Sequence, residues 1–191
     1  GKDSGVYHIS YSGGEAVYAG ETTRTSYSYL GDTLTQVNID APTGSTSLHF
    51  TYDEIGPMSV TYNGAEYFYL KNAQGDVTGL VNSSGTQVVA YTYDAWGNPL
   101  TTTGTMADTL GKLNPFRYRG YFYDTETGLY FLQSRYYNPE TGRFINADSY
   151  ALTGQGVLSG NMFAYCGNNP IVLSDSTGNL PFFAITAALG A

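Results

Sequence analysis

The sequence predicts an all-β protein built from short hairpins. Among its 191 residues, 19 are Tyr and 24 are Gly, whereas Trp occurs once and Met three times. Tyr favours the half-buried surface of a pleated sheet, and Gly favours turns. In addition, a pattern of aromatic residues, then Asp or Asn, then Gly three or four residues later recurs along the chain. These observations favour many short strands over helices.

The first forty residues carry the alternation that is typical of strands. A weak period of two runs through residues 6–10, 17–19 and 26–30. Gly13-Gly14 and Gly31-Asp32 interrupt it. Alternation that is broken by turn-forming residues predicts strands joined by turns.

The recurring pattern predicts six further turns. In each, the Asp or Asn side chain can accept a backbone N–H one or two residues ahead, and the following Gly can take the positive φ that closes the turn. We therefore interpret these residues first as turn formers. They are Asp53, Asn72, Asn82, Asp94, Asp124 and Asn138.

Two regions depart from the hairpin pattern. Residues 99–115 are rich in Thr, and we expect a long loop with a short helical turn at 106–110 that Thr105 can cap. Residues 180–191 are largely apolar and can begin a helix with Pro181 in its first turn, or pack on the core as a strand or helix. Twelve residues are too few to span a bilayer, so any membrane contact would also involve the continuation of this segment.

Composition argues against several classes of function. The net charge is −8 and only eight residues are Lys or Arg, whereas nucleic-acid binding needs a basic face. Cys166 is the single cysteine, so no disulfide can form within the chain. His8 and His49 are far apart and belong to no zinc-ligand pattern. We expect no metal and no cofactor.

The last third of the chain holds its most specific signal. It begins at Arg117-Tyr118-Arg119-Gly120, passes through Ser134-Arg135-Tyr136-Tyr137 and Gly142-Arg143-Phe144, and reaches Asp148. Asn168-Asn169-Pro170-Ile171 and Asp175-Ser176-Thr177-Gly178 follow. This ordered set resembles the core module of the rearrangement-hot-spot (RHS) family, the tyrosine-aspartate (YD) repeat proteins.

The resemblance implies YD-repeat hairpins coiled as part of a hollow RHS shell, with a C-terminal plug that folds inward. It divides the chain into YD-repeat-like strands at 1–87, the RHS repeat-associated core at 88–179, and the apolar start of a toxin or pre-toxin segment at 180–191. The N-terminus shows no apolar run of the kind that a signal peptide has. We expect the chain to be a fragment of a longer protein with more shell upstream.

The function implied by the resemblance is to enclose and deliver a C-terminal polymorphic toxin from a secreted or bacterial cell-surface protein. Implied partners are the upstream shell, the toxin cargo and an immunity protein for that toxin. The alternative is a cell-surface adhesion or carbohydrate-binding module without catalysis, in which Trp96 and exposed tyrosines stack on sugars. Because Trp96 sits within a turn motif, packing is the better interpretation of that residue.

Many RHS cores are also aspartyl-type autoproteases, and the resemblance places that chemistry on three residues. Asp148 and Asp175 would be the carboxylate pair, and Arg143 would orient a carboxylate through a bidentate contact. The bond cut would be Asn179–Leu180. One carboxylate would act as the base and the other would stay protonated, because two close like charges cannot both ionise.

The sequence departs from the family pattern at this motif. Ser176 replaces the usual Pro, Asn179 replaces the usual Leu, and Ser149 stands where Pro often follows Asp148. Two alternatives therefore stay open. Asp148 and Asp175 can be turn or cap residues, and Asn179 can break the chain by cyclising onto its own carbonyl.

Overall fold

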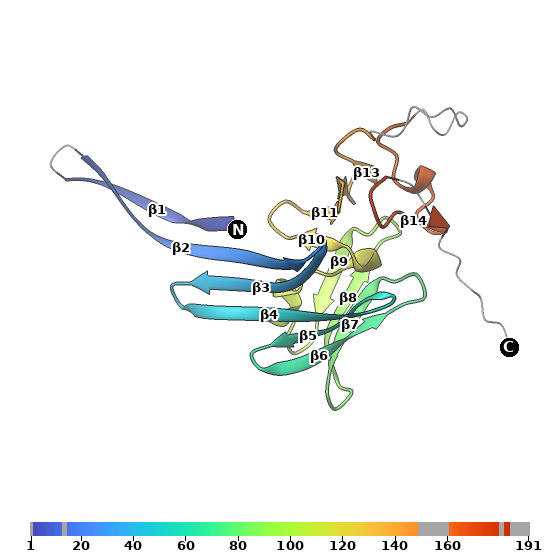
Figure 1. Cartoon of the computed structure of the whole chain (residues 1–191), viewed down its shortest axis with the longest axis horizontal. Coiled ribbons are helices and arrows are strands. Elements are labelled where there is room, and N and C mark those ends of the chain that lie inside the picture. Colours follow the sequence, from blue (N-terminus) through green and yellow to red (C-terminus); the bar gives the residue numbers. More distant parts are fainter. Residues whose placement is uncertain (1, 13–14, 149–160, 180–181, 184–191) are drawn as a thin grey trace.

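The computed structural model describes residues 2–12, 15–148, 161–179 and 182–183. Their strands form three antiparallel sheets of nine, four and two strands. Figure 1 shows the nine-stranded sheet as a long curved surface, with the later strands gathered above one end of it. The prediction of an all-β fold is confirmed.

The nine-stranded sheet is a meander in which each strand pairs with the next one in the sequence. Its early boundaries confirm the predicted breaks, since one strand ends at Ser12 and another ends at Leu30. The strands are β1 (Lys2–Ser12), β2 (Glu15–Leu30), β3 (Thr33–Ala41), β4 (Gly44–Asp53), β5 (Gly56–Tyr62), β6 (Ala65–Lys71), β7 (Val77–Asn82), β8 (Gln87–Tyr93) and β9 (Pro99–Thr103). The sheet therefore continues past the expected domain boundary at 87/88, which stays a prediction.

One face of this sheet carries an aliphatic core. Alternate side chains of a strand point to the same face, so the buried Val and Leu residues collect on one side. Burying one such side chain stabilises the fold by about 1.5–3 kcal/mol. The buried aliphatic residues of this core are Leu34, Val37, Leu48, Val60, Val77, Leu80, Val88 and Val89 from the sheet, and Leu110 from the segment after β9.

The structure corrects the expected long loop at 99–115. Residues 99–103 form β9, which pairs with β8 and has Pro99 as its first residue, where a strand tolerates proline. The helix α1 (Leu110–Leu113) begins where the predicted helical turn ends, and Thr109 rather than Thr105 occupies its N-cap position. Pairing with β8 makes residues 99–103 a strand, and the local composition does not reveal that pairing.

All six predicted turns form as expected. In each, Oδ1 of the Asp or Asn accepts the backbone N–H two residues ahead at 2.8–3.1 Å. The Gly that closes each turn has a φ between +67° and +130°. The repeated pattern therefore encodes hairpin turns.

The four-stranded sheet has a core of tyrosines. Its strands are β10 (Phe122–Asp124), β11 (Leu129–Leu132), β12 (Arg135–Asn138) and β13 (Arg143–Phe144). Two short 3-10 helices, η1 (Tyr118–Gly120) and η3 (Cys166–Asn168), flank it in the sequence. The core consists of Tyr118, Tyr121, Tyr130, Leu132, Tyr137, Phe144, Tyr165 and Cys166.

Three of these tyrosines fasten the four-stranded sheet to the turn between β8 and β9. The hydroxyls of Tyr118, Tyr130 and Tyr137 donate to the carbonyls of Ala95, Gly97 and Trp96 at 3.1, 2.8 and 2.7 Å. Trp96 itself is half-buried and packs against this tyrosine core. Its expected packing role is confirmed.

The third sheet pairs β14 (Leu173–Ser174) with β15 (Phe182–Phe183). Phe182 and Phe183 thus lie in a strand, which corrects the expectation of a helix at these two residues and agrees with the alternative of a strand. The rest of segment 180–191 lies outside the described residues. Within the part of the chain that the structure describes, no helix is both long and apolar enough to cross a membrane.

Candidate functional site

The candidate site centres on Arg135, the first residue of β12. A tight hairpin through Gln133 and Ser134 joins β11 to β12. Arg135 alternates with the exposed Tyr136 and shares the inner face with Tyr137, so its guanidinium points into the fold. The side chain is only 6% exposed, and the guanidinium carbon lies 3.6 Å from the centroid of the Phe144 ring.

Two carboxylates meet this guanidinium. Nη2 of Arg135 lies 3.1 Å from Oδ2 of Asp148 and 3.6 Å from Oδ2 of Asp175. The structure thus brings together the two aspartates that the sequence singled out. Their exposures differ, since the side chain of Asp148 is 13% exposed and that of Asp175 is 1% exposed.

Burial acts on the pKa of the guanidinium in this group. Burial lowers the pKa of Arg135 below its usual range, while Asp148 and Asp175 oppose that shift. Arginine still keeps its charge at neutral pH. The guanidinium is therefore a fixed positive charge beside the two carboxylates.

Asp175 also forms a turn of its own. Its Oδ1 accepts the backbone N–H groups of Gly178 at 2.8 Å, Asn179 at 3.1 Å and Thr177 at 3.3 Å. Gly178 has a φ of +74°, and a Cβ there would lie 2.7 Å from the carbonyl oxygen of Leu132. Asp175 is therefore both a turn former, through Oδ1, and a partner of Arg135, through Oδ2.

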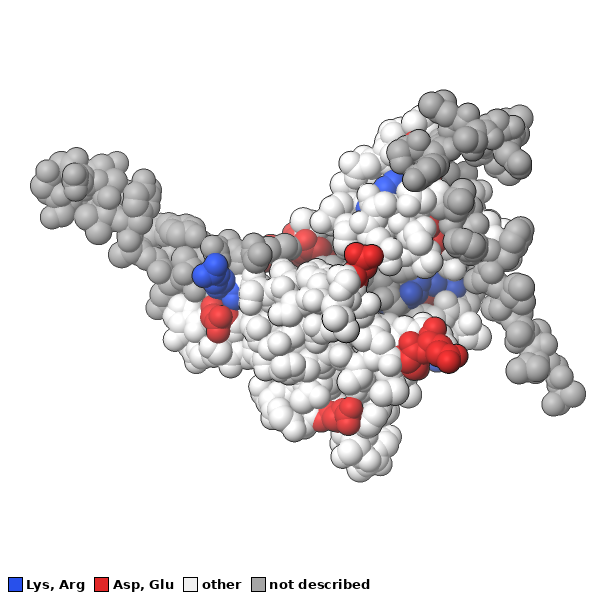
Figure 2. All heavy atoms as spheres, viewed as in Figure 1, with Lys and Arg blue, Asp and Glu red and all other residues white. Residues whose placement is uncertain are grey.

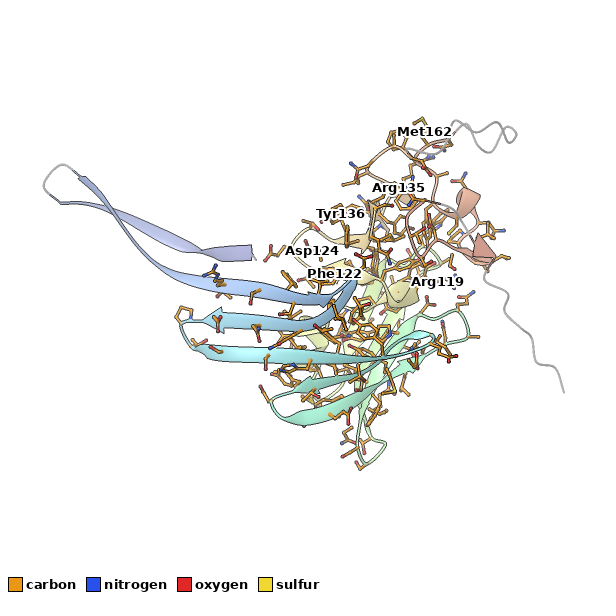
Figure 3. The ribbon with its side chains drawn as sticks, in the orientation of Figure 1. Arg119, Phe122, Asp124, Arg135, Tyr136 and Met162 are labelled. Atoms are coloured by element: carbon orange, nitrogen blue, oxygen red, sulfur yellow. The ribbon has the colours of Figure 1, made fainter. Side chains whose placement is uncertain are left out.

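Arg135 also holds two backbone segments. Its Nε donates to the carbonyl of Gly178, and its Nη1 donates to the carbonyl of Met162 at 3.1 Å. Figure 3 shows Met162 above Arg135, on the segment that returns toward the four-stranded sheet. We call Arg135, Asp148, Asp175 and the carbonyls of Met162 and Gly178 the Arg135 clasp.

Arg143 lies elsewhere. In β13, Phe144 faces the tyrosine core, so its neighbour Arg143 faces outward and is exposed. Among the described residues, the cation that pairs with both carboxylates is Arg135. A signal for Arg135 was present in the sequence, because it stands two positions before Tyr137 and so shares that residue's face.

A second arginine fastens the same part of the chain to the nine-stranded sheet. Arg119 donates to the carbonyl of Gln74 at 2.9 Å and to the carbonyl of Pro170, and its Nε lies 3.6 Å from Oδ1 of Asp76. Gln74 in turn donates to the carbonyl of Ile171 at 2.7 Å. The Asn-Asn-Pro-Ile motif is thus tied to the turn between β6 and β7.

The Arg135 clasp has the groups that peptide hydrolysis requires. An ionised carboxylate can accept a proton from water, and a fixed guanidinium can stabilise negative charge on a carbonyl oxygen. Asn179 follows the clasp directly, whereas Leu180, and with it the far side of the expected scissile bond, lies outside the described residues. Within the described ranges, no group of three or more His, Cys, Asp or Glu side chains is placed to hold a metal ion.

Comparisons with known proteins agree on one family. The chain is 40% identical over 168 residues to the tRNA3(Ser)-specific nuclease WapA of Bacillus spizizenii, a match that covers 87% of this chain and 7% of that protein. It is also 40% identical over 82 residues to toxin protein Tse5 of Pseudomonas aeruginosa, covering 40% of this chain and 6% of Tse5. The chain therefore spans less than a tenth of the length of these relatives.

A solved structure supports the fold. The chain superposes on the Tc holotoxin pore of Photorhabdus luminescens with a TM-score of 0.56 at 19% identity, covering 92% of this chain and 9% of that one. The family model described as Teneurin YD-shell matches residues 20–171, which include most of the nine-stranded sheet, the whole four-stranded sheet and Arg135 with Asp148. The chain belongs to the Teneurin YD-shell family, whose RHS and YD-repeat members include toxin proteins.

Proposed function

We propose that this chain forms the closing end of a hollow shell that encloses a toxin segment, and that the Arg135 clasp fixes the point where the polypeptide leaves the wall. The observation that supports this proposal most is that residues 161–179 are hydrogen-bonded to both of the larger sheets. Arg119 ties Pro170 to the nine-stranded sheet, and Arg135 ties Met162 and Gly178 to the four-stranded sheet. A segment held at both ends is suited to terminate a wall.

Family membership supports the rest of this proposal. Two relatives carry the names of a nuclease and a toxin, and both are much longer than this chain. In the proposed protein, β1 is the first strand in the order of the sheet, so its outer edge can pair with an upstream strand of the same shell. Delivery would be from a secreted or cell-surface protein, with an immunity protein guarding the producing cell and any membrane contact made through 180–191 and its continuation.

Enclosure is tested by exposing the full-length protein to an added protease. The downstream segment is expected to survive while the shell is intact and to be digested after mild unfolding of the shell. The same segment, prepared alone, is the control. Digestion of the segment at equal rates inside and outside the shell would contradict enclosure.

We further propose that the chain cuts itself at Asn179–Leu180. The observation in favour is that Asp148 and Asp175 converge on one guanidinium beside the turn that presents Asn179. Asp148, the more exposed carboxylate, takes a proton from water as the water oxygen attacks the carbonyl carbon of Asn179. Arg135 stabilises the oxyanion, and the proton passes to the amine of Leu180 as the peptide bond breaks. Asp175 positions Arg135 and the turn.

Self-cleavage is tested by the intact mass of the chain with a folded reporter protein fused after Ala191. The expected product is a reporter that begins at Leu180. Asp148→Asn should abolish its release, whereas Arg143→Met and the turn variant Asp94→Asn should release it as the parent does. Near-ultraviolet circular dichroism shows whether each variant is folded.

Two other outcomes would contradict acid–base hydrolysis. Release that Asp148→Asn leaves unchanged but Asn179→Ala abolishes would point to cyclisation of Asn179 instead of acid–base hydrolysis. A folded chain that stays whole would contradict both routes. Neither of these results bears on enclosure, which the protease experiment tests separately.

A further inference from the structure

A cavity of about 490 Å³ lies where the nine-stranded and four-stranded sheets meet. The ends of β2, β3 and β4 form one side of it, and β10, β11 and β12 form the other. Figure 3 shows Phe122, Asp124 and Tyr136 on the side that faces β2, and Figure 2 shows acidic side chains along the hollow between the two parts of the molecule. The volume is within the range of about 300–1,000 Å³ that is usual for sites that bind small ligands.

The lining of this cavity is strongly aromatic. Eight of its seventeen described lining residues are Tyr or Phe, whereas aromatic residues make up 15% of the whole chain. Pairs of rings build its walls, with centroids 6.0 Å apart for Tyr27–Phe122 and 5.1 Å apart for Phe131–Tyr136. Packing within the fold does not cover all of these rings, since Tyr29 is 57% exposed and Tyr136 is 40% exposed.

The charge of the lining has one sign. Asp32, in the turn between β2 and β3, and Asp124, at the end of β10, are its charged members, and no Lys, Arg or His is among the lining residues that the structure describes. Oδ1 of Asp124 is used by its own turn, where it accepts the N–H of Glu126 at 3.1 Å. Burial raises the pKa of Tyr29 and of Tyr52, and the neighbouring hydroxyls of Tyr136 and Tyr29, respectively, add to these shifts.

Aromatic faces and a carboxylate attract the same kind of ligand. The face of a ring carries partial negative charge and attracts an ammonium or guanidinium group, with a preference that grows as the cation loses water. The carboxylate of Asp32 adds a full negative charge at the edge of the cavity. A neutral apolar ligand would use the rings and gain nothing from that carboxylate.

We propose that this cavity binds the side chain of a lysine or arginine carried on an extended peptide, with Tyr29, Tyr136 and Asp32 receiving the cation. The apolar residues that flank the basic residue fill the rest of the cavity against Phe122 and Phe131. The inference stands on the cavity alone and requires neither enclosure of a toxin nor cleavage at Asn179.

The test is a calorimetric titration of the 191-residue chain with acetyl-Leu-Lys-Leu-amide. The same peptide with norleucine in place of Lys keeps the length and apolar surface but lacks the charge, and the peptide with Arg tests the second cation. The Lys and Arg peptides should bind at least about threefold more tightly than the norleucine peptide, as expected for a partly exposed cation–π contact with a nearby carboxylate. Added salt should reduce this difference.

Matched variants locate the site. Asp32→Asn and Tyr136→Ser should each weaken the Lys peptide by about two- to fivefold. Asp40→Asn and Phe68→Ser change equally exposed residues outside the cavity and should leave the affinity unchanged. Equal affinity for the Lys and norleucine peptides, equal losses in the control variants, or no saturable binding would each overturn the proposal.

Discussion

The two larger sheets are stabilised in different ways. The nine-stranded sheet buries mainly Val and Leu, whereas the core of the four-stranded sheet consists largely of tyrosines. Aliphatic burial is non-directional, but Tyr118, Tyr130 and Tyr137 each donate to a carbonyl in the turn between β8 and β9. The comparison teaches that the nine-stranded sheet is extended by repeating an aliphatic pattern, whereas the four-stranded sheet is placed against it by specific hydrogen bonds.

The turns show the same contrast. Asp94 and the five other predicted turn residues accept a hydrogen bond from the backbone of their own turn and lie at or near the surface. Either Asp or Asn can occupy such a position. Asp175 makes the same kind of turn but is buried and faces Arg135. The local motif is shared, and burial against a cation gives Asp175 its additional role.

The largest expected effect comes from removing a ring of the tyrosine core. Tyr130→Ala deletes a fully buried ring and its bond to Gly97, and we expect a loss of about 3–5 kcal/mol in the free energy of unfolding. Urea denaturation followed by circular dichroism measures it. A loss below about 1 kcal/mol would mean that this core collapses around the gap and is not specifically packed.

The two kinds of turn should respond differently to the same substitution. Asp175→Asn keeps an oxygen for the turn but removes the charge that faces the buried Arg135, so we expect a loss of about 1–3 kcal/mol in unfolding free energy. Asp94→Asn introduces Asn into an exposed turn, and Asn72 already forms a turn of this kind. The loss in the free energy of unfolding should therefore stay within about 0.5 kcal/mol. Equal losses of unfolding free energy in the two variants would show that the contact of Asp175 with Arg135 adds no stability beyond that of an ordinary turn.

A smaller effect is expected from removing one hydroxyl. Tyr137→Phe keeps the ring but leaves the carbonyl of Trp96 without this donor, which should cost about 1 kcal/mol in the free energy of unfolding. Tyr67→Phe on β6 is the matched control, because the described residues provide no partner for that hydroxyl, and its change should be near zero. Comparable losses in both variants would show that the hydrogen bonds from tyrosine hydroxyls to the β8–β9 turn do not contribute specifically to stability.

The smallest expected effect is the change of the free energy of unfolding with pH near neutrality. Burial raises the pKa of Cys166 from 9.0 to about 12 and raises the pKa of Tyr130 and Tyr165 well above 10.0. Because these folded-state pKa values are raised, the stability that these groups contribute is fully present below pH 9 and is lost as the pH rises above it. The urea concentration at which half of the protein is unfolded should therefore stay constant between pH 7 and 8.5. It should fall above pH 9.

Absorbance of tyrosinate provides a direct check of this pH dependence. The buried tyrosines should ionise together with unfolding, and Cys166→Ala should remove the part of the loss that begins near pH 9. Because exposed tyrosines such as Tyr29 also contribute to the signal, the informative part is the absorbance that Tyr130→Phe and Tyr165→Phe remove. If that part rose near pH 10 in the folded protein, it would contradict the assignment of a closed tyrosine core.

The turns and most hairpins could be predicted from the sequence because they depend on neighbours. Asp53 and Gly56, for example, are three residues apart, and their geometry is local. Strand β9 was not predicted, because its strand character depends on pairing with β8. For Phe182 and Phe183 the sequence left both a helix and a strand open for the same reason, since their pairing partner is β14.

The site was predicted in part. The resemblance to RHS cores singled out Asp148 and Asp175, and both lie at the Arg135 clasp. It assigned the cation to Arg143, whereas strand alternation places Arg135 on the inner face and Arg143 on the outer one. The aromatic cavity was not predicted at all, because its lining comes from strands far apart in the sequence.

Hydrogen exchange at the turn 175–179 tests the central claim, that the Arg135 clasp holds the chain just before Asn179. The account predicts slow exchange at the amides of Gly178 and Asn179, and fast exchange at both in Arg135→Met, while Gly97 in the Asp94 turn keeps its rate in that variant. Fast exchange at Gly178 and Asn179 in the unmodified chain, with the nine-stranded sheet still protected, would contradict it.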